Sequence, residues 1–214
     1  MPKAAQEKEI RAIATSNFEI RVKEGGAKLI EGYAIEWDQL SVPIGYWMKF
    51  REKFKKGAFR EYLDATDSDT KFLIGHNINQ VLGRRKNNTL ELKEDDKGLW
   101  FSLELPNTSQ GNDTHESVKR ADVDKISIGF RMLGEEWDES DEANIVRTVT
   151  KANLPEISLT AWPAYEQTSA SARSIDDAYK EFKESNTDSR SVTDKPIQPD
   201  YSLRKKKLDL ISKI

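Results

Sequence analysis

Short segments in which apolar and polar residues alternate recur along most of the chain, and this pattern restricts the fold more than any other feature of the sequence. In KISIGFRM every second residue is apolar, as in a strand that buries one of its faces. Asn87-Asn88 and Asp95–Gly98 separate successive segments, which is typical of tight turns in a meander. The predicted strands are Glu9–Thr15, Phe18–Lys23, Ala27–Trp37, Lys71–Asn77, Val81–Lys86, Thr89–Lys93, Leu99–Leu105, Lys125–Met132, Ile145–Lys151 and Glu156–Trp162.

Helical patterns are few. Lys53–Leu63 predicts a helix interrupted by Gly57, and Thr108–Val123 predicts a polar surface helix. Glu135–Asn144 is acidic and indicates a loop, and Gly83-Arg84 indicates a turn. Many short strands with few helices favour an α+β fold whose strands form a barrel or a sandwich.

The chain changes in composition near residue 173, which predicts a compact domain over residues 1–173 and a flexible charged tail over residues 174–214. The tail is rich in Ser, Asp and Lys, is net negative over residues 174–202 and is net positive over residues 203–214. It is either a solvated segment with a short helix at its end or a docking peptide for an acidic partner.

Composition also limits the chemistry. Cys is absent, which excludes a disulfide scaffold, a thiol nucleophile and Cys-ligated metal sites, and two His residues leave little room for a metal centre. We expect neither a metal nor a cofactor. The net charge of −3 does not favour direct binding of nucleic acid, and no apolar run is long enough to span a membrane. Because the first residues lack the apolar stretch of a secretory signal, the cytosol is the expected compartment.

Three segments carry candidate catalytic groups. Ser127 lies opposite the apolar row of its strand, and Gly129 leaves space for a substrate backbone beside it. His76 ends an apolar run and is a candidate general base, whereas His115 lies in a polar helix and is expected at the surface. Glu156 opens the last strand, where a carboxylate can orient an imidazole. Each residue alone also fits a purely structural role.

Together these segments resemble the prohead maturation proteases of tailed bacteriophages over residues 28–173. The resemblance rests on LIEGYAIEWD, FKKGAFREYL, GHNINQVLGR around His76, DKISIGF around Ser127, and LPEISLTAWPAYEQT around Glu156. The family's fold is similar to herpesvirus assemblin, which implies a small, mostly antiparallel β-barrel flanked by helices.

The resemblance implies a catalytic triad in which Ser127 is the nucleophile, His76 its general base and Glu156 the third member. Asp124 and Asp122 are alternative carboxylates for the third role. The herpesvirus relatives place a pair of arginines in the loop that follows the triad. This chain has only Arg173 there, so backbone amides are equally good candidates for oxyanion donors. A role for Arg84 is an open alternative.

The implied function is a serine endopeptidase, packaged inside the phage procapsid in the host cytoplasm. It would cleave the scaffold, or a scaffold-like arm of the major capsid protein, and then itself. The herpesvirus relatives work as dimers, which suggests a homodimer. Two other readings stay open: a catalytically inactive, β-rich procapsid module, and a glycosidase that would use acids such as Asp138 and Glu142.

Overall fold

The computed structural model describes residues 9–13, 18–45, 49–161 and 183. Contacts between Cα atoms divide the chain into two units, Met1–Ala178 and Tyr179–Ile214, and every strand and helix named below belongs to the first. The predicted domain boundary at residue 173, and the predicted tail apart from Lys183, lie outside the described residues.

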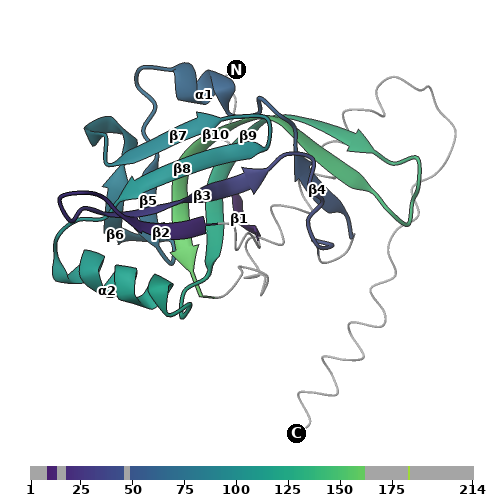
Figure 1. The fold of residues 1–214 in the computed structure, drawn as a ribbon. Coiled ribbons are helices and arrows are strands. Elements are labelled where there is room, and N and C mark those ends of the chain that lie inside the picture. Colours follow the sequence, from purple (N-terminus) through teal and green to yellow (C-terminus); the bar gives the residue numbers. More distant parts are fainter. Residues whose placement is uncertain (1–8, 14–17, 46–48, 162–182, 184–214) are drawn as a thin grey trace, which may run out of the picture. The chain divides into compact units, whose positions relative to one another are not determined.

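Sheet A has six strands, and its two longest, β9 and β10, lie at its centre (Figure 1). The order along the sheet is β1-β9-β10-β5-β6, and β4 also pairs with β10. β10 runs parallel to β4 and β5, whereas the other pairs are antiparallel. The strands are β1 (Glu9–Ile13), β4 (Arg51–Phe54), β5 (Lys71–Ile74), β6 (Asn77–Arg84), β9 (Lys125–Asp138) and β10 (Val146–Thr160).

Sheet B is antiparallel and has four strands in the order β2-β3-β8-β7 (Figure 1). Its strands are β2 (Phe18–Val22), β3 (Lys28–Glu36), β7 (Leu90–Glu94) and β8 (Gly98–Glu104). The apolar sides of the two sheets share one core, because Phe72 of β5 lies 5.2 Å from Phe101 of β8 between ring centroids. The alternating segments of the sequence therefore supply the inner faces of both sheets.

The helices are short. They are α1 (Arg60–Asp64), the 3-10 helix η1 (Arg85–Asn87) and α2 (Ser109–Lys119). Thr108 caps α2, because its side chain accepts a hydrogen bond from the N–H of Gly111. The mainly β, mostly antiparallel architecture is confirmed. No closed barrel is found among the described strands, which form two separate sheets.

Several predicted elements differ from the structure. Lys53–Leu63 is not one helix: its start belongs to β4, and a left-handed Gly57 precedes α1. Part of the predicted acidic loop continues β9 to Asp138, where pairing with β10 outweighs the polarity of the side chains. The last two predicted strands are one strand, β10, whose pairing with β9 shifts around Pro155, a residue that cannot donate to the ladder.

Gly83-Arg84 is not a turn but the end of β6. A Cβ atom at Gly83 would lie 2.6 Å from Cδ1 of Leu103 in β8. The glycine therefore lets sheet A approach sheet B closely, and its role is packing between the sheets.

A buried ion cluster joins four strands of sheet A. The guanidinium of Arg147 in β10 lies 2.9 Å from a carboxylate oxygen of Glu9, 3.0 Å from Glu52 and 2.5 Å from Glu135. The Arg147 side chain is 1% exposed. Burial by itself lowers the pKa of the guanidinium, but the carboxylates of Glu52, Glu9 and Glu135 outweigh burial and raise the pKa above its ordinary value. The cluster ties β1 and β4 to the β9–β10 pair.

Candidate active site

The nucleophile candidate Ser127 lies on β9, in the alternating segment. The Ile126, Ile128 and Phe130 side chains point into the core and are fully buried. Because successive side chains of a strand alternate between its faces, Ser127 lies on the opposite face, as predicted. It is nevertheless buried, with 0% of the residue exposed.

The adjacent strand β10 places two polar residues on the same face. Ser158 pairs directly with Ser127, and Glu156 pairs with Gly129. Both β10 residues are buried, at 4% exposure for Glu156 and 0% for Ser158. Since glycine has no side chain, the position opposite Glu156 on β9 is free of one.

His76 reaches this face from a tight turn on the other side of β10. β5 runs parallel to β10, with Ile74 paired to Leu159, and β5 is joined to β6 by Gly75 and His76 alone. Both turn residues are left-handed, with φ of 56° at Gly75 and 60° at His76. This is the geometry of a type I′ hairpin, and it aims the imidazole across the end of β10.

The three side chains form one hydrogen-bonded chain across neighbouring strands. His76 Nε2 lies 2.7 Å from Oγ of Ser127, and His76 Nδ1 lies 2.5 Å from Oε1 of Glu156. Because the carboxylate can only accept, Nδ1 carries a proton toward Glu156, and Nε2 is left as the acceptor for the Ser127 hydroxyl. The His76 side chain is 19% exposed and that of Glu156 is 5% exposed, so these hydrogen-bonded side chains are mostly shielded from solvent.

The family model of the caudovirus prohead serine proteases matches residues 16–182. The chain belongs to this family. It is therefore a serine protease of bacteriophage capsid maturation, which acts at the procapsid. The match includes His76, Ser127 and Glu156 and begins after β1 ends. No curated protein and no solved structure matches the chain significantly.

The other candidate acids of this prohead protease lie in different contacts. Asp124 pairs with Lys125 at 2.6 Å and Asp122 with Arg120 at 3.1 Å, whereas the carboxylate against His76 is Glu156. The Asp138 carboxylate accepts hydrogen bonds from Ser140 at the end of β9.

His115 and Arg84 also lie apart from the three residues. His115 lies on α2 and is half-buried rather than solvated, and burial, followed by the charges of Lys28 and Lys119, lowers its pKa. Arg84 binds Asp69. Burial by itself raises the pKa of the Asp69 carboxyl, but hydrogen bonds from Arg84 and Lys71 outweigh burial and lower this pKa to about 2. Arg84 is thus engaged at the base of the β5–β6 hairpin, and Arg173 lies outside the described residues.

Sequence reasoning missed one residue at the site. The Ser158 hydroxyl accepts the backbone N–H of His76 at 3.2 Å. The signal was present, because Glu156 and Ser158 are polar positions of one face in an otherwise apolar strand end. What the sequence did not show was that the backbone N–H of His76, 82 residues earlier in the chain, donates to the Ser158 hydroxyl.

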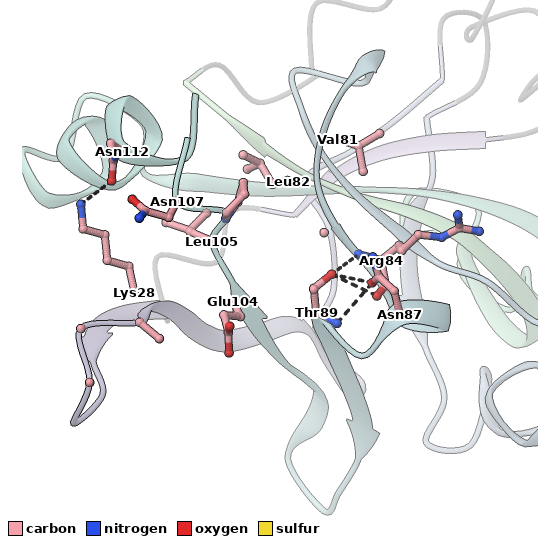
Figure 2. A pocket seen from close by; sticks show the side chains of 15 residues that line it. Lys28, Val81, Leu82, Arg84, Asn87, Thr89, Glu104, Leu105, Asn107 and Asn112 are labelled. Carbon is pink, nitrogen blue, oxygen red and sulfur yellow. Dashed lines mark hydrogen bonds between the residues drawn. The ribbon is translucent and has the colours of Figure 1, made fainter. Parts of the chain in front are cut away.

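A cavity of about 520 Å³ lies elsewhere, between the β2–β3 turn, β6 and the start of α2 (Figure 2). Lys28 there points toward Asn112 and donates to it at 2.7 Å, and the Arg84 N–H donates to Thr89 Oγ1 at 2.9 Å. None of the three site residues lines it. We assign it no chemistry, because these polar groups bind one another.

No group of three or more His, Asp or Glu in the described part of the chain is placed to hold a metal ion. None of the described helices is long and apolar enough to cross a membrane.

Replacement of Gly75 by alanine tests the turn. A Cβ atom has open space there, so the effect comes from the left-handed backbone, which costs an L-residue about 1 kcal/mol. We expect a loss of that size in urea unfolding and a fall in protease activity greater than the loss of stability explains. Gly25→Ala, in another left-handed turn with open space, is the control that should lose stability alone.

Proposed function

We propose that Ser127 is the nucleophile of this prohead protease, His76 its general base and Glu156 the carboxylate that orients His76. The observation that carries the proposal is the hydrogen-bonded chain, with 2.7 Å between Nε2 and the serine oxygen and 2.5 Å between Nδ1 and the carboxylate. Proton transfer requires donor and acceptor at such distances.

The steps follow from this order of groups. The Ser127 oxygen attacks the carbonyl carbon of the scissile peptide bond while its proton passes to Nε2 of His76. The imidazolium, stabilised by Glu156, then gives that proton to the leaving amine, and an acyl-enzyme remains. A water molecule then attacks the acyl-enzyme in the same way, with His76 accepting its proton, and the acid product is released as Ser127 regains its proton. Because the site is shielded from bulk solvent, the electrostatic interaction between Glu156 and the imidazolium is stronger than it would be in water.

The negative oxygen of the tetrahedral intermediate needs donors. Backbone amides and Arg173 are the candidates. Arg84 is a poor one, because its guanidinium is bound by Asp69. Each preorganised donor raises the rate by a factor of about 10²–10³. Loss of one donor is therefore expected to slow catalysis rather than to abolish it.

For substrates, we propose the procapsid scaffold, or a scaffold-like arm of the major capsid protein, followed by the tail of the enzyme over residues 174–214. Family membership supports a role in capsid maturation. Segments that pack poorly are the preferred places for cleavage, and the tail composition is that of such a segment. We also propose a homodimer as the working form.

The direct experiment is co-expression of the chain with the capsid and scaffold proteins of its own phage. Mass spectrometry of assembled particles is expected to show cleaved capsid or scaffold polypeptide and a shortened protease. Intact partners, together with no labelling by a fluorophosphonate probe, would instead indicate the inactive procapsid module.

The Glu156→Gln substitution tests the third role. The amide presents a donor or a weaker acceptor to Nδ1, so the imidazole loses its orienting charge and its correct tautomer. A loss of about 10⁴-fold in kcat is expected by comparison with the carboxylate-to-amide substitution of the third member in a Ser-His-Asp protease. Asp124→Asn is the matched control and should cleave normally. If Asp124→Asn is the inactive variant and Glu156→Gln is active, the third member is misassigned.

A further inference from the structure

Ser158 occupies the centre of the proposed site without belonging to the proposed triad. It lies on β10 between β9 and β5, in register with Ser127 on one side and Leu73 on the other. It follows Glu156 by two residues and so shares the face of the carboxylate. It is 0% exposed, and a buried hydroxyl is costly unless it makes a hydrogen bond.

The partner of this hydroxyl is the backbone of His76. The hairpin ladder ends at the Ile74–Asn77 pair, so the N–H groups of the two turn residues need partners elsewhere. The Gly75 N–H donates to the Leu159 carbonyl at 2.8 Å, and the His76 N–H donates to Ser158 Oγ at 3.2 Å. Two consecutive residues of β10 therefore hold the two residues of the turn.

These two hydrogen bonds matter because His76 has an unfavourable backbone conformation. A non-glycine residue with φ of 60° is uncommon, and such a conformation persists only where the surroundings impose it. If the turn relaxed, the imidazole would move with it. A shift of about 1 Å between reacting groups can lower a rate by about 10²-fold.

We propose that Ser158 is a positioning residue for catalysis: its hydroxyl fixes the left-handed turn and thereby sets Nε2 of His76 against Ser127. The inference rests on the proposed roles of His76 and Ser127. A role in packing alone would be met equally well by alanine, so the two readings differ in what loss of the hydroxyl does to rate.

The test compares Ser158→Ala, Ser158→Thr and wild type by the rate of labelling with a fluorophosphonate probe and by cleavage of the co-expressed capsid and scaffold proteins. Ser158→Ala is expected to label about 10- to 100-fold more slowly, whereas Ser158→Thr, which keeps a hydroxyl, recovers most of the rate. Amide hydrogen exchange at His76 should be faster in Ser158→Ala, because its N–H has lost its acceptor.

Thr70→Val is the matched control. Thr70 is also 0% exposed, and its hydroxyl donates to the Leu154 carbonyl at 2.7 Å, away from His76. This variant should lose stability without losing labelling rate. Should Ser158→Ala fail to fold, Ser158→Cys takes its place, since sulfur is a weaker acceptor of nearly the same shape, and the same slow labelling is expected.

The outcomes separate the two claims. Labelling of Ser158→Ala at the wild-type rate, or equal losses in the Ala and Thr variants, would overturn the positioning role while leaving the proposed triad intact. Labelling and cleavage by Ser127→Ala would overturn the triad itself.

Discussion

Ser127→Ala is expected to reduce cleavage of the cognate capsid or scaffold protein by about 10⁶-fold, to background. The variant lacks the hydroxyl oxygen that lies 2.7 Å from Nε2 of His76, so no acyl-enzyme forms and His76 has no serine proton to take. Because serine to alanine removes one buried atom from a strand that is otherwise unchanged, the fold should remain. Mass spectrometry of co-expressed particles measures the effect, and the protease itself should keep its tail.

Ser102→Ala is the control for this experiment. Ser102 also lies in a strand and donates from its hydroxyl to Glu31 at 2.9 Å, but it belongs to sheet B, so cleavage should be normal. A normal rate in Ser127→Ala contradicts the assignment of the nucleophile. An intact tail in a wild-type protein that cleaves its partners contradicts only the proposal of self-cleavage.

Arg147→Met is expected to lower the free energy of unfolding by about 3–5 kcal/mol. The substitution leaves the carboxylates of Glu9, Glu52 and Glu135 together without the guanidinium that binds all three. Glu52 is itself 1% exposed, so water cannot replace the lost partner well. Urea unfolding followed by circular dichroism measures the loss, and the melting temperature should fall by roughly 6–20 °C.

Two comparisons make this prediction specific. Arg60→Met removes an exposed guanidinium 3.6 Å from Glu94 and should change stability by less than about 1 kcal/mol. Adding Glu52→Gln to Arg147→Met should recover part of the loss, because it removes one of the three carboxylate charges that Arg147 balances. Equal stability of Arg147→Met and wild type would mean that the cluster does not hold β1 and β4 in place.

The local pattern of apolar and polar residues was sufficient to predict much of the fold. The period-2 alternation of KISIGFRM places Ile126, Ile128 and Phe130 in the core and Ser127 on the other face, as expected from the sequence. The α2 helix and most strands also lie where polarity and turn residues predict them. These features depend on neighbouring residues, whose side-chain directions follow from the backbone geometry.

Features that depend on contacts with residues distant in the sequence could not be predicted from local sequence pattern. Gly83 resembles a turn residue, but the close approach of Leu103 explains it. The polar stretch Glu135–Asp138 resembles a loop, but β10 pairs with it. Arg147 resembles an ordinary strand arginine, although its carboxylate partner Glu9 is 138 residues away. In each case a contact from another part of the chain overrides the local preference.

The sequence by itself determined which faces of the strands are apolar and which residue types are available for chemistry: serines on polar strand faces, two histidines and no cysteine. The family resemblance implied that these residues act together, but only the tertiary structure decided the geometry in which His76 contacts Ser127, 51 residues away, and Glu156, 80 residues away. The reason is that three neighbouring strands and one left-handed turn bring these groups within hydrogen-bond distance, and sheet pairing between remote segments leaves no local trace in the chain.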